Sequence, residues 1–327
     1  ATEHKEAGRE SEARLATSEA ITHLVKATTI MDTVWSGLSS DSARIKYAAG
    51  HQERLQVNHM LQQAYVDLSR ETEALVCAEA GRAQSLELLL TQQRQQHYHG
   101  ASGAESVDAP PSQISIENIV DFVKAQRVCI IYYSVVQNGR ELERSSLNRT
   151  RTRVLAWVVS SLGVITCHPF FVPDSLAHLV EMTRRCMGAS ERVEVRSAAD
   201  SVPAIDTDLL QEEMGSLLAA EDPTSKLLRR CHDTFIAPLG QAVASERRLI
   251  VVPDQELYAL PFAALLDADG KYLIQKHSIR LAPSIGAIIE ISKRATKEGA
   301  VRALVVGGPD YTSWTNSSGE HLCELTG

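Results

Sequence analysis

Residues 1–99 carry a helical pattern of apolar and polar positions. Between Ser11 and Leu38 apolar side chains recur at steps of three and four residues, which is typical of an amphipathic helix. A second helix is predicted from Ala43 to Leu68, and a third follows the break at Ser69–Thr72. Because only short breaks separate these helices, we expect antiparallel helical hairpins of the kind found in repeat proteins.

Residues 100–113 break this pattern. The segment is built from small residues and two prolines, and it has almost no large apolar side chain to bury. We therefore predict a linker here, which divides a helical region at 1–99 from a second region at 114–327.

Residues 114–327 alternate between the periods of strands and helices, which favours an α/β region with a sheet covered by helices. Ser115 is placed to cap its first helix, which runs to about Gln126. The further predicted helices are 173–187, 209–219, 225–244 and 285–295. The predicted strands are 128–136, a hairpin of 154–159 with 164–167, and then 249–252, 272–274, 278–282 and 301–306.

The balance of acidic and basic residues limits the classes of partner that the chain is expected to bind. The 327 residues include 33 Lys+Arg and 41 Asp+Glu, which give a net charge of −8. An acidic chain is a poor candidate for nucleic-acid binding, and no apolar run is long enough for a membrane span. The first twenty residues are polar, so we expect no signal peptide. Six cysteines without a C-x-x-C pair predict neither a zinc site nor disulfides, and they favour a cytoplasmic location.

Several motifs resemble one known family. The run Leu249–Asp254 followed by Leu260–Leu265 resembles the hallmark of the CHAT domain, the caspase-like domain associated with tetratricopeptide repeats (TPR). Residues 272–274 (YLI), 282–284 (APS) and 304–310 follow in the order of that family. The sequence Ala-Glu-Ala-Gly-Arg-Ala at 78–83 is similar to the last repeat helix that precedes such domains. The chain thus resembles a fragment of a TPR-CHAT protein with an incomplete caspase- and separase-like domain.

This resemblance implies a cysteine peptidase that is regulated through its TPR helices. In that family the general base lies in a segment like H-x-A-T-H-G and the nucleophile in one like S-A-C-x-T-G, both after the strand that here ends at Gly307. Neither segment occurs in this sequence. We therefore assign no catalytic, cofactor-binding or metal-binding residue, and we expect this chain to be inactive.

The hallmark residues also have a plain structural interpretation. Proline at 253 ends strand pairing and Asp254 forms turns readily, so Asp254 is interpreted first as a turn former. Leu260, Phe262 and Leu265 are expected in the core. Gly307 and Gly308 are not followed by a GK[ST] sequence, so they do not indicate a nucleotide site.

Other cysteines and histidines in the sequence are further candidates for a catalytic dyad or a metal site. The neighbours Cys231–His232 and Cys167–His168 point apart on a helix or strand, so neither pair forms a dyad by itself. Cys129 and Cys167 are expected to be buried and inert. The sets Cys323 with His321 and His97 with His99 lack further ligands, and the Arg-rich loop Arg140–Arg153 is interpreted as solvated, with an acidic partner as its alternative.

Two functions remain open from the sequence. The chain is either a fragment of a peptidase or a non-catalytic scaffold that binds a protein or peptide partner through its N-terminal helices. The helices make at most one and a half repeat-like units, whereas stacked repeats usually need three. We therefore expect Leu24, Trp35 and Leu61 to be exposed and to promote self-association.

Overall fold

Strand β1 (Cys129–Val136) forms the centre of the sheet and is buried along its whole length. Its side chains alternate between two apolar clusters: Ile131 and Tyr133 belong to one, and Ile130 and Tyr132 to the other. A strand that is covered on both faces needs apolar side chains at every position. This explains the continuous apolar run by which the sequence predicted it.

The structure is a computed structural model that describes residues 2–38, 52–82, 114–136, 152–172, 175–187 and 222–294. Its α-helices are α1 (Thr2–Ser36), α3 (Gln52–Asp67), a helix over 71–82, α5 (Ile116–Gln126), α6 (Leu176–Cys186), α8 (Pro223–Phe235), α9 (Gln241–Ala244), α10 (Leu273–Lys276) and α11 (Ile285–Arg294). Three short 3₁₀ helices are η1 (Ala237–Leu239), η2 (Gln255–Ala259) and η3 (Phe262–Ala264). The other strands are β2 (Thr152–Val159), β3 (Ile165–Val172), β4 (Arg248–Val252) and β5 (Ser278–Leu281).

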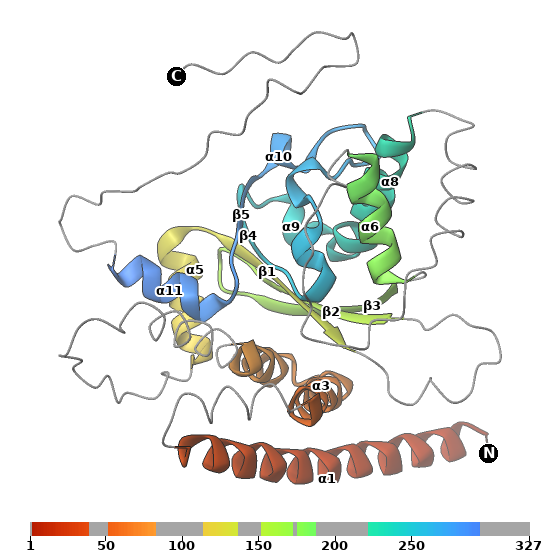
Figure 1. Ribbon diagram of the computed structural model, residues 1–327. Coiled ribbons are helices and arrows are strands. Elements are labelled where there is room, and N and C mark those ends of the chain that lie inside the picture. The colour runs from red at the N-terminus through yellow and green to blue at the C-terminus, as the bar shows by residue number, and fades with distance from the viewer. Residues whose placement is uncertain are drawn as a thin grey trace, which may run out of the picture. The chain divides into compact units, whose positions relative to one another are not determined.

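The five strands form one mixed sheet in the order β3-β2-β1-β4-β5 (Figure 1). The predicted hairpin is confirmed, because β2 pairs antiparallel with β3 across the turn at 160–164. Strand β2 also pairs antiparallel with β1. Strand β4 then lies parallel to both β1 and β5, so the carboxyl ends of these three strands meet at one edge of the sheet.

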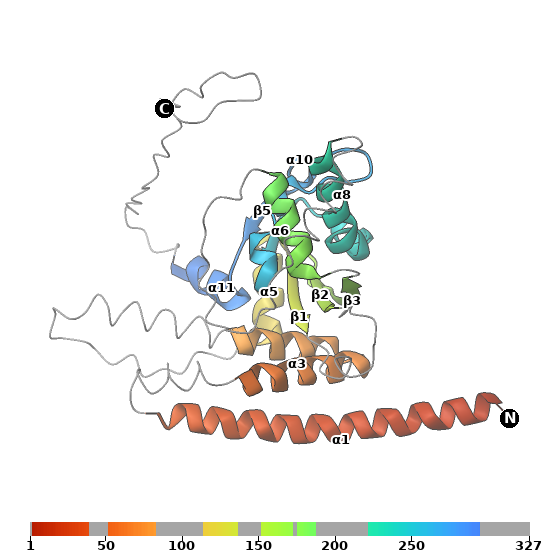
Figure 2. The same ribbon diagram turned by 45° about the vertical axis from the view of Figure 1, so that its right-hand side comes forward.

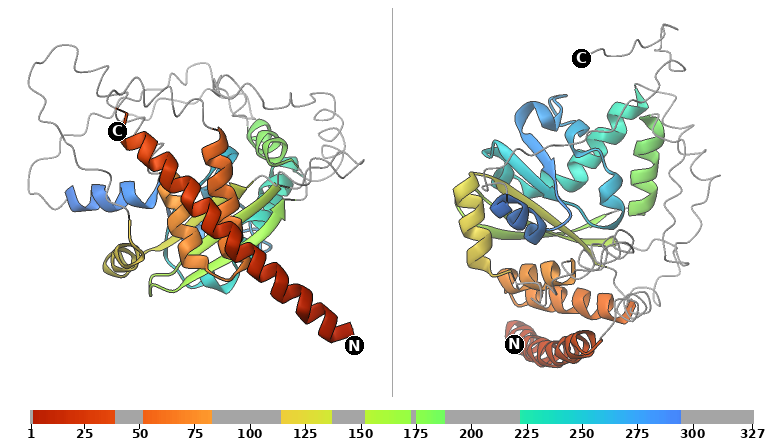
Figure 3. Two further views of the ribbon diagram at one scale, coloured as in Figure 1. Left: turned by 90° about the horizontal axis from the view of Figure 1, so that it is seen from below. Right: turned by 60° about the vertical axis from the view of Figure 1, so that its left-hand side comes forward.

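Helices cover both faces of the sheet, as the predicted α/β class requires (Figure 2). One face packs against α6, α8 and the short helices from η1 to α10. The other face packs against α5, the helix over 71–82 and the start of α11 (Figure 3). Ser115 caps α5 as predicted, since its Oγ accepts a hydrogen bond from the Asn118 amide at 3.3 Å.

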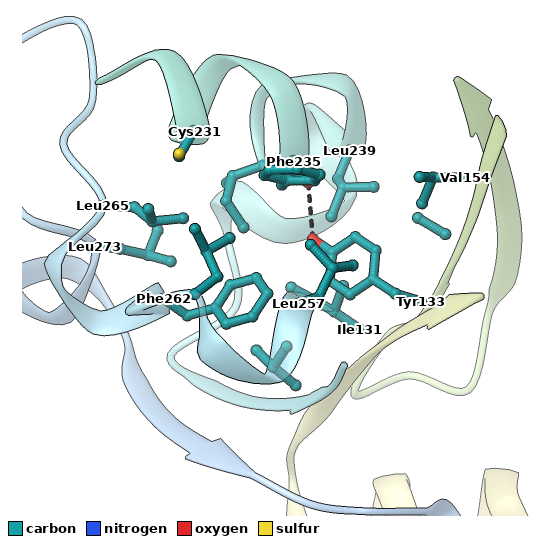
Figure 4. Close-up of a cluster of buried hydrophobic side chains, with 14 of the residues drawn as sticks. Ile131, Tyr133, Val154, Cys231, Phe235, Leu239, Leu257, Phe262, Leu265 and Leu273 are labelled. Atoms are coloured by element: carbon teal, nitrogen blue, oxygen red, sulfur yellow. Dashed lines mark hydrogen bonds between the residues drawn. The ribbon is translucent and has the colours of Figure 1, made fainter. Parts of the chain in front are cut away.

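The first apolar cluster contains the core residues that the hallmark motif predicted (Figure 4). Leu260, Phe262 and Leu265 are all buried. The ring of Phe262 stacks on Tyr133 with 5.7 Å between centroids, and the Tyr133 hydroxyl donates to the Phe235 carbonyl at 2.7 Å. The motif therefore anchors the segment after β4 beneath α8.

The N-terminal helices differ from the prediction in what they bury. Helix α1 is longer than expected, and Leu15 on it is 64% exposed. Ile21 is buried against Leu61 of α3. The expectation that Leu61 is exposed was wrong, because this contact leaves it only 4% exposed, and Leu24 is half-buried beside the same cluster.

Two predicted elements were wrong. Residues 272–274 are not a strand: after a single bridge from Tyr272 to Leu266 the chain turns into helix α10, which buries Leu273 in the core. The helix predicted over 225–244 is broken after Phe235, because Pro238 cannot donate a helical hydrogen bond and Gly240 has a φ of +50°.

The Arg-rich loop also needs a correction at its end. Arg153 is part of β2 and does not belong to a loop; it pairs with Asp67 of α3 at 3.2 Å. Positions 140–151 of that loop lie outside the described residues, as do the side chain of Trp35, the predicted linker, and the predicted elements at 209–219 and 301–306. The division at 100–113 and the repeat-like character of the helices remain predictions.

Candidate functional site

The carboxyl ends of β1 and β4 carry a group of polar contacts between segments that are distant in the sequence. Ligand sites of open α/β sheets lie at this edge. Strand β4 ends before Pro253, which has no amide hydrogen with which to continue the ladder. Beyond this point two side chains supply the hydrogen bonds to β1: Asp254 Oδ2 accepts from the Val135 amide at 2.8 Å, and Gln255 Nε2 donates to the Val135 carbonyl at 3.1 Å. Asp254 is therefore more than the turn former that the sequence suggested.

Arg82, at the end of the helix over 71–82, is the second component of this site. Its guanidinium donates to the Pro253 carbonyl at 2.7 Å and also to the Tyr133 carbonyl. It lies 3.3 Å from Asp254 Oδ1 and 4.2 Å from the centroid of the Tyr132 ring. One planar cation thus binds both parallel strands and the carboxylate that follows them, which a lysine could not do with the same geometry.

Glu79 joins the same helix to the start of α11. Its Oε1 accepts from the Gly286 amide at 2.8 Å, while Ser284 caps α11 by accepting from the Ala287 amide at 3.0 Å. A Cβ at position 286 would lie 2.3 Å from Ile114 Cδ1, so a larger residue there would require the Ile114 side chain to move. Burial raises the pKa of Glu79, against the effect of its backbone hydrogen bonds.

Two further buried groups surround Arg82. Burial raises the pKa of Tyr132 well above its ordinary value. Burial lowers the pKa of His59 on α3, while the charge of Asp254 acts in the opposite direction. Within the described part of the chain, Glu79 Oε2 and the Tyr132 hydroxyl have no hydrogen-bond partner. We call Arg82, Asp254, Glu79, Tyr132 and His59 the clasp.

The clasp is arranged to hold elements together. Its cation is engaged by carbonyls and a carboxylate, and its side chains are largely buried. Among the described ranges, no group of three or more His, Cys, Asp or Glu side chains is placed to hold a metal ion, and no helix there is long and apolar enough to cross a membrane.

The cysteines that the sequence offered as candidate nucleophiles lie outside the clasp. Cys231 belongs to the core beneath α8, where its Sγ lies 3.3 Å from Thr183 Oγ1 (Figure 4). Burial raises its pKa to about 11 and raises the pKa values of Cys129 and Cys167 to about 12. Such thiols stay protonated at neutral pH, which disfavours them as nucleophiles.

Their neighbouring imidazoles contact other groups. His168 pairs with Thr166 at 3.0 Å, and His232 lies 3.4 Å from Asp233. The sets His97 with His99 and His321 with Cys323, and the pair Gly307–Gly308, fall outside the described residues.

The sequence motifs contain Arg82 and Asp254 of the clasp, but they do not indicate that the two residues are in contact. Arg82 and Asp254 stand in the two motifs on which the family resemblance rests. No local spacing relates residues so far apart in the chain, so the pairing became visible only in three dimensions.

Comparisons with known proteins agree with those motifs. The family model described as "CHAT domain" matches residues 225–323. Tetratricopeptide repeat protein 28 of Mus musculus is 21% identical over 341 residues, and its counterpart from Homo sapiens is 22% identical over 327 residues. Each alignment covers 77% of this chain but only 13% of the relative. The predicted resemblance is therefore confirmed: residues 225–323 match the CHAT domain model, in a chain similar to tetratricopeptide repeat protein 28.

Proposed function

We propose that this chain is the part of a TPR-CHAT protein in which a protein-binding helical region is joined rigidly to the CHAT sheet. The observation that carries the proposal is the position of Arg82, which binds the Tyr133 carbonyl of β1, the Pro253 carbonyl that follows β4, and Asp254. A residue in the repeat-like helix thereby helps to close the edge at which α/β proteins build their sites.

The whole helix over 71–82 supports this role. Its middle packs into the second apolar cluster, where Ala74 and Leu75 are fully buried. At its start, the Glu71 carboxylate accepts from the Cys167 amide of β3 at 2.9 Å, and the Glu71 carbonyl accepts from Trp157 Nε1 at 2.9 Å. Because the helix contacts the sheet at its start, middle and end, a displacement of the helix would be transmitted to the sheet.

The partner surface in this proposal lies on α1 and α3. The relatives are tetratricopeptide repeat proteins, and repeat helices bind peptides and proteins along their stacked faces. Large apolar side chains are exposed there, including Ile30 at 65%, Leu55 at 54% and Met60 at 54%. Self-association through this surface is a further expectation.

A binding experiment tests the proposal. A displayed peptide library is selected against the full chain, and the dissociation constants of the selected peptides are measured for Ile30→Glu and Leu55→Glu. We expect both variants to weaken binding, while Leu162→Glu, which alters a 77% exposed leucine on the β2–β3 turn, should not. Peptides that bind all variants equally well would contradict the proposal, and so would a selection without binders.

A peptidase function of the longer protein is the second candidate. The CHAT match favours it, because the resemblance implies a His base and a Cys nucleophile in that family. Under this reading the chain itself does not cleave peptides. Release of peptide fragments by the chain, abolished by Cys231→Ser, would overturn that expectation.

A further inference from the structure

Strand β5 is the last strand on one side of the described sheet, next to β4 (Figure 1). Its even-numbered positions bond toward β4: the amides of Ser278 and Ala282 donate to the carbonyls at positions 247 and 251, at 2.8 and 2.9 Å. Backbone groups point to alternate sides along a strand. Ile279 and Leu281 therefore direct their amides and carbonyls away from β4, and no described residue forms a hydrogen bond with them.

The chain limits this open edge at both ends. Before it, the His277 amide donates to the Leu273 carbonyl of α10 at 3.0 Å. After it, Pro283 has no amide hydrogen, and its carbonyl accepts from the Tyr258 hydroxyl at 3.2 Å. Positions 277 and 283 are on the same side of the chain as 279 and 281. A pairing strand thus meets free backbone groups at 279 and 281 and is stopped on either side of them.

The two faces of this edge differ in chemistry. Ile279 packs on the first apolar cluster, and Leu281 on the same face is 55% exposed. Arg280 lies between them on the opposite face, where its side chain is exposed. No carboxylate in the described ranges pairs with Arg280. The edge therefore presents apolar surface on one face and an available positive charge on the other.

A second copy of the chain fits this edge poorly. Antiparallel pairing about a two-fold axis would put positions 279 and 281 opposite each other and would place two Arg280 side chains directly opposite. The Cα atoms of such a non-hydrogen-bonded pair are about 4.5 Å apart, and like charges there are destabilising. Charged side chains on edge strands commonly oppose edge-to-edge association in this way. The same charge favours a different strand that carries a carboxylate at the central position.

We propose that the β5 edge binds an extended segment of a protein partner with the pattern apolar–acidic–apolar, added to the sheet as an antiparallel strand. The carboxylate lies opposite Arg280. The two apolar residues lie opposite Ile279 and Leu281, and each exchanges a pair of backbone hydrogen bonds with the edge. We choose the antiparallel direction because it is slightly more stable per residue and brings the central side chains closest.

This site is independent of the proposed function. It shares no residue with the clasp or with the surface on α1 and α3. Backbone pairing supplies the affinity in this mode of recognition, and the side chains on alternate faces supply the specificity. The two contributions can therefore be tested separately.

Fluorescence anisotropy with the full chain tests the charge. The probe is a labelled peptide with Val-Glu-Val at its centre and Gly-Ser at each end, at a salt concentration that screens charges more than about 8 Å apart. Arg280→Glu should weaken binding about three- to tenfold, because it replaces an attractive cross-strand pair by a repulsive one. A peptide with Lys in place of Glu should recover binding to this variant. Arg229→Glu on α8 alters another exposed arginine and changes the net charge equally, so this matched control should change binding less than about twofold.

Methylation of peptide amides tests the strand pairing. In the proposed register the amides of both valines point to β5, whereas the amide of the central glutamate points away. Methylation of either valine amide should weaken binding at least about tenfold, since it removes a backbone donor and places a methyl group against the edge. Methylation of the glutamate amide should preserve most of the affinity. Equal losses from all three methylated peptides would overturn strand addition.

Hydrogen exchange of segment 277–282 locates the bound peptide. The peptide should slow exchange of the Ile279 and Leu281 amides. Protection of these amides in the free chain would show that another segment of the chain covers the edge, and protection that grows with protein concentration would show that a second copy does. Either result would overturn the proposal, as would equal weakening by Arg280→Glu and Arg229→Glu or no measurable peptide binding. Far-ultraviolet circular dichroism checks that each variant is folded.

Discussion

Removing the Arg82 guanidinium should destabilise the protein through Asp254. Arg82→Met keeps much of the aliphatic stem but deletes the donors to the Pro253 and Tyr133 carbonyls. Breaking a buried ion pair costs about 3–5 kcal/mol. The Arg82 side chain is 14% exposed and that of Asp254 is 21% exposed, so the low end applies, about 3 kcal/mol.

A double-mutant cycle separates the ion pair from the other contacts. Asp254→Asn keeps an oxygen for the Val135 amide but removes the negative charge. We expect a coupling energy of about 1–2 kcal/mol between the two substitutions, since residues in one charged network are not additive. The Arg82 contacts to carbonyls would account for the rest of the loss.

The assay is urea unfolding followed by circular dichroism and by tryptophan fluorescence. Trp157 is buried and donates to the helix at Glu71, so its emission reports on helix docking. Arg280→Met, at an exposed position, should change the free energy of unfolding by no more than about 0.5 kcal/mol. Additivity of Arg82→Met and Asp254→Asn within about 0.5 kcal/mol would refute the clasp as a coupled unit.

Three further predictions concern buried groups. Because burial raises the pKa of Glu79, the folded protein keeps the Glu79 proton above pH 4.5 while the unfolded chain loses it. The free energy of unfolding therefore falls as the pH rises through that window, by up to about 1.4 kcal/mol per pH unit. Glu79→Gln should remove this slope from urea midpoints measured between pH 4 and 7, and an unchanged slope would contradict the assignment. Leu75→Ala should cost about 2–5 kcal/mol in the same assay because Leu75 is fully buried against the sheet, and a loss below about 1 kcal/mol would mean that the helix is not part of this core. Burial raises the pKa of Cys231 to about 11, so this thiol should react with iodoacetamide at least about a hundredfold more slowly in the folded than in the unfolded chain. Mass spectrometry of the alkylated peptide measures the two rates, and equal rates would disprove the burial of Cys231.

Local patterns predicted much of the sheet and its covering helices. The apolar run of β1, the hairpin of β2 and β3, and the Ser115 cap of α5 all depend on neighbours in sequence. Local composition was misleading at one short segment: residues 272–274 have strand-like composition, yet the chain enters helix α10 at Leu273, which is buried in the core. Proline and glycine at 238 and 240 signalled the break after α8, although the predicted helix ran through them.

The sequence by itself determined the strand and helix periods, the capping residues and the two motifs that contain Arg82 and Asp254, because these depend on contacts within a few residues. Only the tertiary structure decided that the motifs meet, that β5 lies at an edge of the described sheet, and that Leu61 is buried. The physical reason is that an ion pair between segments distant in the sequence forms only after packing has brought their backbones together. The residues next to each partner in the sequence do not indicate which distant segment will lie beside it.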